Sequence, residues 1–512
     1  MLLLDHVCRG WGHETLIAIP TKFLNKGLNA SAVLIASLLL PAVLVLTVFP
    51  TPLYDTRELI AWGRQFPLLT PDHPPMMAWV GGSADLVFGS SGLATILVAQ
   101  GLIALGLVFF YRALRLLVTR ERAALFAFLY GTSFYVVFGS LSFALNADLL
   151  QLTSWPAVVF YALRALRAGR LSDWIALAVW SAVAFLTKYN AAVLIVGLAI
   201  AALVEPDYRL ALSRPGFYVA VIVGGLLICP HAIVALQHPG ALTYGLDHFH
   251  PDNSFGTRLK GISEWMLGFI VCSTPGSIAL LLGFWRGSFV LRAPAAVEAL
   301  KASRFLAVAN VAMQLILLGV ILFGGVEYLF RFSPPYLMMA ALALGPWIDW
   351  RGDGERWFAR YVVPAIAALN LSILVVLLVV YGGFASHSGL QEPTGAGARA
   401  ILQDWHKTYS CGPGYFFGVR QRVYGIGIEA GRDVTPLALE DIRGALWFDP
   451  DKLRRKGAVF VDTKRSNTSW VAVYEPNFVL SDDRSVSLPL LRTHKPGAQF
   501  TYSYTFLAPQ GC

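Results

Sequence analysis

Two short charged segments lie close together near the start of a chain that is otherwise strongly apolar. The first is Tyr54-Asp55-Thr56-Arg57-Glu58, and the second is Pro71-Asp72-His73-Pro74-Pro75. Carboxylates, a guanidinium and an imidazole within so small a region can bind an anion and move a proton. Charges beside a membrane span are costly unless they face a cavity or a partner, so these segments predict a functional site. The structural alternative is that Asp55 caps a helix and His73 lies in a turn.

The residues around these segments must hold the charged side chains in place. Pro74-Pro75 fixes two φ angles and favours an extended backbone at His73, which places the imidazole on a stiff piece of chain. The stretch after Asp55 predicts a short amphipathic helix, with an apolar face made of Leu59, Ile60, Trp62 and Phe66. We therefore expect a catalytic loop, residues 51–90, on the surface of a membrane.

The composition is that of a polytopic α-helical membrane protein. Of 512 residues, 56% are hydrophobic and 14% are charged, and the mean hydropathy is +0.59. The net charge of +9 comes from basic residues in short loops between apolar runs. This distribution follows from membrane topology, so it argues against nucleic-acid binding. Charged residues between Asp5 and Glu14 interrupt any pattern of a cleaved signal peptide.

The apolar runs predict about eleven membrane spans. Their expected ranges are 28–50, 91–114, 123–143, 147–166, 172–187, 190–204, 216–237, 264–285, 304–325, 334–350 and 361–383. Every even-numbered span is followed by arginine or lysine, which predicts that those loops and the N-terminus are cytoplasmic. Residues 51–90 and everything after the eleventh span are then expected on the opposite face.

The composition changes to that of a soluble domain near Ser386. We therefore expect a membrane module in residues 1–385 and a small α/β domain in residues 386–512. Within that domain, Gly457–Asp462 predicts a buried strand and Ala398–Lys407 predicts a helix. Cys411 and Cys512 both lie in this non-cytoplasmic region and could pair, although the sequence does not show that they meet.

The outward loops contain a limited set of polar groups. Besides the first two segments, they include Asn146 and Asp148, the run Thr187-Lys188-Tyr189-Asn190, and Arg331. Acids and bases at one depth suit a site that binds phosphate and moves a proton. Lys188 is either a phosphate ligand or the partner of Asp148 or Asp55 in an ion pair, and both interpretations stay open. His238, His248 and His250 do not have a standard zinc spacing, so no metal site is predicted from them.

These motifs resemble the bacterial family 39 (PMT-2-like) glycosyltransferases. Asp55 is followed seventeen positions later by Asp72-His73-Pro74-Pro75, which is similar to the first outer loop of that family. Leu186-Thr187-Lys188-Tyr189 is similar to its Leu-Thr-Lys-Tyr segment, and Asn146-Ala147-Asp148 to its Thr-Pro-Asp segment. Pro230-His231 and Arg331 with Pro334 match weaker positions. The resemblance covers most of the membrane region, in order.

The resemblance implies a GT-C fold and an enzyme similar to protein O-mannosyltransferases and the lipid A aminoarabinose transferase. Such an enzyme takes a sugar from a polyprenyl-phosphate carrier and passes it to a glycolipid or protein on the periplasmic face of the bacterial inner membrane. An acceptor of the lipopolysaccharide type is favoured. The resemblance implies Asp55 as general base or as a carboxylate that orients the acceptor. It implies that the donor phosphate is bound by His73, Lys188 and Arg331. Supporting or acceptor-side roles fall to Arg57, Glu58, Asp72, Asp148 and Tyr189.

One departure from the family pattern leaves metal dependence open. The second acid of the family motif is Thr56 here, with Glu58 two positions further on. A divalent metal would therefore need Glu58 as a substitute ligand. The sugar, the acceptor and the prenyl length are not determined by the residues. Two other classes remain, a transporter or flippase of lipid-linked sugars and a structural subunit of an envelope complex. A transporter usually shows inverted repeats, and the sequence has none that we detect.

Overall fold

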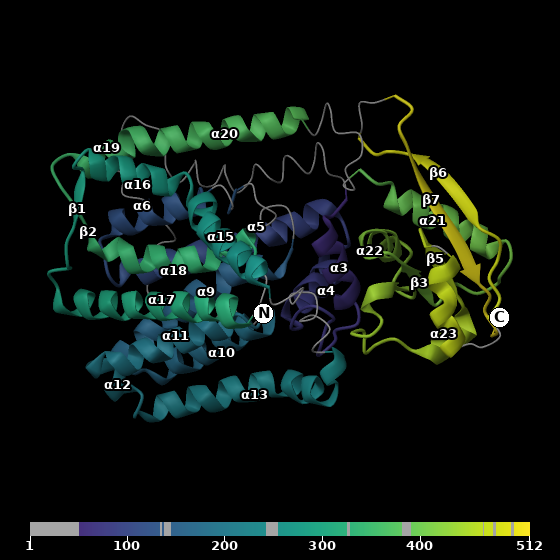
Figure 1. Ribbon diagram of the computed structural model, residues 1–512, viewed down its shortest axis with the longest axis horizontal. Coiled ribbons are helices and arrows are strands. Elements are labelled where there is room, and N and C mark those ends of the chain that lie inside the picture. The colour runs from purple at the N-terminus through teal and green to yellow at the C-terminus, as the bar shows by residue number, and fades with distance from the viewer. Residues whose placement is uncertain are drawn as a thin grey trace.

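The computed structural model describes residues 51–133, 136–137, 145–241, 254–324, 328–380, 391–463, 465–474, 478–492 and 496–511. The first predicted span, 28–50, lies outside this part of the chain. Long helices make up most of the molecule, and a β-sheet with its own helices forms the other end (Figure 1). The fold is therefore mostly helical with a C-terminal sheet, as the sequence predicts.

The loop predicted at residues 51–90 contains two helices, α3 (Tyr54–Gly63) and α4 (Met76–Phe88). Leu59, Ile60 and Trp62 are buried on the inner face of α3, as expected. Phe66 is 51% exposed instead, because α3 ends at Gly63 and the chain turns through a positive φ at Phe66. A side chain at Gly63 would overlap the backbone of α4, so this glycine permits the close packing of the two helices.

Four described helices are long and apolar enough to cross a membrane. They are α5 (Gly92–Arg115), α9 (Ala147–Ala168), α13 (Pro215–Gln237) and α17 (Val297–Gly324). A fifth span is possible if α15 (Phe255–Ser273) and α16 (Gly276–Trp285) count as one, since they meet at a bend of 78°. The shorter apolar helices α10 (Leu171–Thr187) and α11 (Ala191–Val204) match predicted ranges as well.

The predicted count of eleven spans is not confirmed. Instead of one span over 334–350, α18 (Pro334–Leu344) is followed by a 3-10 turn, η3 (Gly345–Trp347), and a short strand, β2 (Ile348–Trp350). Gly345-Pro346 ends the helix because proline cannot continue its hydrogen bonding. In the range 123–143, α6 covers only Arg120–Gly131 of the described residues. The last predicted span, 361–383, contains α20 (Val363–Val379).

The connections that the sequence assigns to the cytoplasm gather at one end of the helices. β1 (Phe289–Leu291) pairs antiparallel with β2 there, and α12 (Pro206–Ala211) and α19 (Gly354–Trp357) lie at the same end (Figure 1). The C-terminal sheet lies at the opposite end. This separation agrees with the alternation of basic loops, and the cytoplasmic assignment itself stays a prediction.

The C-terminal region has a five-stranded sheet in the order β4-β3-β5-β7-β6. The strands are β3 (Tyr415–Gly418), β4 (Thr435–Ala438), β5 (Ala458–Val461), β6 (Arg484–Pro489) and β7 (Gln499–Leu507). β4, β3 and β5 are parallel, and β7 and β6 are antiparallel additions. The predicted strand at 457–462 is confirmed as β5, and the predicted helix at 398–407 corresponds to α21 (Thr394–His406). Cys411 is disulfide-bonded, while Cys512 lies outside the described residues.

The sheet region packs directly on α3 through α22 (Arg420–Glu429). The Trp62 indole donates a hydrogen bond of 2.9 Å to the Tyr424 hydroxyl, and both side chains are buried. Arg57 and Glu392 form an ion pair of 3.0 Å in which each side chain is only 1% exposed. One apolar core includes residues of α3, α4, α5 and α9 together with α21, α22 and the sheet. The C-terminal region is therefore packed against the membrane part rather than loosely tethered to it.

Candidate active site

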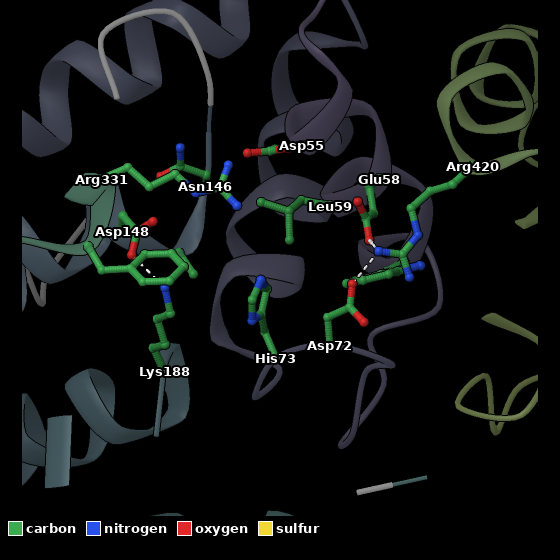
Figure 2. A pocket seen from close by; sticks show the side chains of 13 residues that line it. Asp55, Glu58, Leu59, Asp72, His73, Asn146, Asp148, Lys188, Arg331 and Arg420 are labelled. Atoms are coloured by element: carbon green, nitrogen blue, oxygen red, sulfur yellow. Dashed lines mark hydrogen bonds and ion pairs between the residues drawn. The ribbon is translucent and has the colours of Figure 1, made fainter. Parts of the chain in front are cut away.

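A cavity of about 250 Å³ lies where the membrane part meets the C-terminal region. Figure 2 shows charged side chains approaching it from opposite sides. Its lining comes from α3, the loop before α4, the starts of α9 and α22, the end of α10, and the turn before α18. The lining residues are Asp55, Glu58, Leu59, Trp62, Asp72, His73, Asn146, Ala147, Asp148, Lys188, Arg331, Phe332 and Arg420.

Most of the predicted site residues come together in this cavity. Seven of them line it: Asp55, Glu58, Asp72, His73, Asp148, Lys188 and Arg331. Two others do not. Arg57 is buried between α3 and Glu392, and its Nε donates to the Pro52 carbonyl oxygen at 2.7 Å. The Tyr189 hydroxyl instead bonds to His231 Nε2 at 3.0 Å.

The basic side of the cavity is formed by Lys188 and Arg331. Lys188 follows α10 directly, and its Nζ donates to Asp148 Oδ1 at 2.6 Å. The same ammonium lies 4.0 Å from the centre of the Phe332 ring, and the Arg331 guanidinium lies 5.4 Å from that ring. A cation over an aromatic face is stabilised by the ring quadrupole. Phe332 therefore helps to hold two cations on the same side of the cavity.

Asp55 lies in the first turn of α3, where the helix dipole favours a carboxylate. The N-cap is Leu53, so the capping role considered from the sequence is not observed. The Asp55 side chain is open to the cavity (Figure 2). The surrounding protein nevertheless raises its pKa by burial, and the Arg331 guanidinium opposes part of that rise. A carboxylate in this state is a stronger proton acceptor than an exposed aspartate.

His73 projects into the middle of the cavity between its basic and acidic sides (Figure 2). The Thr70 hydroxyl donates to the His73 carbonyl oxygen, and Pro74-Pro75 follows immediately. Burial lowers the pKa of His73 to about 4, and the charge on Lys188 acts in the same direction. The imidazole is therefore neutral at pH 7 and can act as a hydrogen-bond donor but not as a cation.

The acidic side of the cavity surrounds Arg420, the first residue of α22. Its guanidinium forms ion pairs with Asp72 and Asp441, and its Nη1 lies 3.5 Å from Glu58 Oε1. Burial raises the pKa of Glu58 well above its usual range despite the opposing charge of Arg420. Burial also raises the pKa of Asp441 to about 6. Although burial alone would lower the pKa of Arg420, these carboxylates raise it, so the arginine stays charged.

Arg420, Asp441 and Phe332 were missed as site residues by reasoning from the sequence. Arg420 belongs to the region expected to form a separate soluble domain, and no local motif marks it. Asp441 is 369 positions from Asp72 in the sequence, yet both carboxylates bind the Arg420 guanidinium. Phe332 follows Arg331 directly, so its position next to a predicted site residue was the sequence feature that could have identified it.

The acidic side does not form a metal site among the described residues. No group of three or more His, Cys, Asp or Glu side chains in that part of the chain has a geometry that could hold a metal ion. Glu58 and Asp72 are both held by the Arg420 guanidinium instead.

A family model described as dolichyl-phosphate-mannose-protein mannosyltransferase matches residues 72–234, a segment that runs from Asp72 past Lys188 and His231. No curated protein matches the sequence closely enough to count as a relative. The predicted resemblance to PMT-2-like glycosyltransferases is therefore confirmed for this segment.

Solved structures of ArnT from Cupriavidus metallidurans share the fold of the whole chain. The structure bound to undecaprenyl phosphate has a TM-score of 0.61 and 14% identity, covering 95% of this chain and 98% of that one. The structure in the apo state has a TM-score of 0.57 and 13% identity, covering 93% and 97%. The chain therefore has an ArnT-like fold along nearly its full length, including the C-terminal region.

Proposed function

We propose that this chain is an integral-membrane glycosyltransferase that moves a sugar from a polyprenyl-phosphate donor to an acceptor. The observation that carries the proposal is the cavity in which Asp55 lies opposite Lys188 and Arg331. It pairs a proton acceptor with two cations, which are the groups that such a transfer needs. The ArnT-like fold supports it, since one ArnT structure holds undecaprenyl phosphate.

Asp55 is the general base of the proposed reaction. It takes the proton from the acceptor hydroxyl while that oxygen forms a bond to the anomeric carbon of the sugar. The bond from that carbon to the phosphate oxygen breaks on the opposite side, so the configuration inverts. The raised pKa of Asp55, which results from burial, suits this role because a base is most effective when its pKa approaches the working pH.

Lys188 and Arg331 bind the phosphate of the donor and stabilise the negative charge that it gains on leaving. Phe332 holds both cations in position from one side. His73, being neutral, adds a hydrogen bond and no charge. Asp148 keeps Lys188 oriented in the absence of the donor through the 2.6 Å ion pair. A polyprenyl donor arrives laterally from the lipid, so its phosphate reaches this basic side without leaving the membrane surface.

The acceptor occupies the other side of the cavity in this proposal. A glycolipid of the lipopolysaccharide or lipid A type is favoured over a protein because of the similarity to ArnT. The membrane module then comprises residues 1–385 and the periplasmic domain residues 386–512, with the cavity on the periplasmic face of a bacterial inner membrane. This orientation rests on the basic loops at the opposite end of the helices.

Mass spectrometry of envelope glycolipids and glycoproteins tests the proposal. Cells carrying the wild-type chain, a deletion, Asp55→Asn, and Asp349→Asn are compared. Asp349 is a matched control because it is an acid on β2, far from the cavity, in a weak ion pair of 3.9 Å with Arg122. We expect a glycan to disappear in the deletion and in Asp55→Asn, with build-up of a polyprenyl-phosphate sugar, and to persist in Asp349→Asn. Equal profiles in all four strains would favour a flippase or an assembly subunit.

A further inference from the structure

Arg420 reaches the cavity from the C-terminal domain. It begins α22, in which Val423–Ile428 are buried, and its guanidinium lines the cavity beside Glu58 and Asp72 (Figure 2). The ion pair with Asp72 joins positions that are 348 residues apart in the sequence. The domain that the sequence separates from the membrane part therefore contributes a charged wall to its site.

We propose that Arg420 is a positioning residue of the transferase, through which the C-terminal domain fixes the Asp72-His73 segment and the charges on the acidic side of the cavity. The inference rests on the function proposed above. It extends that function, because it makes the C-terminal domain part of the active site.

The Asp72-His73 segment is held from two directions. On the membrane side, His231 of α13 donates from Nδ1 to the Leu68 carbonyl oxygen at 2.7 Å. On the other side, the C-terminal domain touches the backbone of the segment, because a Cβ at Gly444 would lie only 2.8 Å from Pro71 Cα. Arg420 then binds the next side chain, Asp72. A shift of the C-terminal domain must therefore move the residues on either side of Pro71, and His73 with them.

Arg420 is itself held rigidly by a chain of buried hydrogen bonds. Asp441 uses Oδ1 for Arg420 and Oδ2 for the Tyr424 hydroxyl, and its side chain is fully buried. The Tyr424 hydroxyl in turn accepts the hydrogen bond from Trp62 of α3. Because Asp55 belongs to the same helix as Trp62, the network places the proposed base and Arg420 in a fixed relation. Such a network orients a side chain more accurately than a single surface contact does.

Arg420 also sets the charge of its surroundings. Acids face its guanidinium from three elements: Glu58 from α3, Asp72 from the loop before α4, and Glu440 and Asp441 from η6 (Leu439–Asp441). Tyr424, Asp55 and His73 are further titratable groups nearby, and Lys188 and Arg331 line the basic side of the cavity. Without Arg420, the buried carboxylates repel one another and bind protons at higher pH. The acid limb of the pH–rate profile, where the rate falls as the pH decreases, then moves to higher pH.

The test uses the full-length protein with Arg420→Met, Arg420→Lys and the matched control Arg432→Met. Arg432 is an arginine of the same domain that also binds an acid of the loop region, Asp85 at 3.0 Å, outside the cavity. Binding of undecaprenyl phosphate to purified protein is the first readout. We expect it to be unchanged in all three variants, because Lys188 and Arg331 are intact.

The second readout is the initial rate of formation of the transfer product across a range of pH, in open membrane vesicles from the deletion strain carrying each variant. We expect Arg420→Met to lower the rate about 100-fold, because misplaced reacting groups react more slowly. We also expect it to move the acid limb to higher pH. Arg420→Lys keeps the charge without the fork that reaches two carboxylates, so it lowers the rate less and leaves the acid limb in place. Arg432→Met leaves both unchanged.

Three outcomes overturn the inference. If Arg420→Met has the rate and the pH profile of the wild type, Arg420 does not position the active site. If Arg432→Met lowers the rate as much as Arg420→Met does, the effect of Arg420 is only to hold the C-terminal domain against the membrane part. If Arg420→Lys moves the acid limb to higher pH relative to the wild type, the role of the charge is excluded. This comparison holds even if Arg420→Met does not fold. If the wild-type protein neither binds undecaprenyl phosphate nor yields a transfer product, the proposed function itself fails, and that result is distinct from the other three.

Discussion

Lys188, just after α10, and Asp148, in the first turn of α9, form an ion pair of 2.6 Å at the basic side of the cavity. The sequence left two interpretations of Lys188 open, a structural ion pair and a phosphate ligand. The ion pair is observed, and the phosphate contact stays a prediction. The two are compatible, because an ammonium has three N–H donors and Lys188 lines the same cavity as Arg331.

Replacing Lys188 separates these two roles. Lys188→Met leaves Asp148 without its cation in a partly buried position, so it lowers the thermal unfolding temperature. It also removes a charged contact to the donor, which should weaken undecaprenyl phosphate binding about 10- to 100-fold. The double variant with Asp148→Asn is expected to recover stability but not binding. Wild-type affinity in the double variant would contradict the phosphate role.

Asp55→Asn and Glu58→Gln distinguish the proposed general base from the neighbouring acid on the same helix. Loss of the general base at Asp55 should lower the rate about 100- to 10,000-fold while the protein still binds undecaprenyl phosphate. Burial raises the pKa of Glu58 well above its usual range, and its carboxyl group faces Arg420 rather than the basic side of the cavity. Glu58→Gln should therefore cost far less activity. Rates measured with purified variants decide the assignment, and equal losses would contradict it.

The lowered pKa of His73 predicts a pH dependence of stability. The unfolded chain binds a proton at His73 near pH 6.5, whereas the buried imidazole does so only near pH 4. Between these values the unfolded state binds more protons, so stability falls as the pH decreases from about 6.5 to about 4, by up to about 3 kcal/mol. Above pH 6.5 this contribution vanishes. The difference in unfolding temperature between wild type and His73→Gln should change across this window and stay constant above it.

Arg57 is predicted to act on stability and not on the reaction. Arg57→Met leaves the buried Glu392 with one of its two described arginine partners, Arg422, and should destabilise the protein by about 3 kcal/mol. Donor binding should persist in the folded fraction, because Arg57 does not line the cavity. Thermal unfolding and undecaprenyl phosphate binding of the same preparation test both statements. Arg57→Lys serves as a control, and its stability is expected to lie between those of the wild type and Arg57→Met. A loss of binding at full stability would return Arg57 to the acceptor-side role that the sequence implies.

The sequence by itself determined much of the membrane part and of the cavity. Apolar runs placed most helices within a few residues, because burial in lipid acts on each segment separately. The alternation of basic loops grouped Asp55, His73, Asp148, Lys188 and Arg331 on one face, and these residues do line one cavity. The resemblance added roles for them, and those roles are the predictions above.

Only the tertiary structure decided which charged groups face the cavity and which are used elsewhere. Arg57 pairs with Glu392 across 335 positions, Tyr189 turns to His231, and Arg420 enters from the C-terminal domain. Hydropathy and charge patterns are properties of neighbouring residues. The direction of a side chain and its partner depend on packing between distant segments, here α22 against α3. No pattern in the sequence of α22 records that contact.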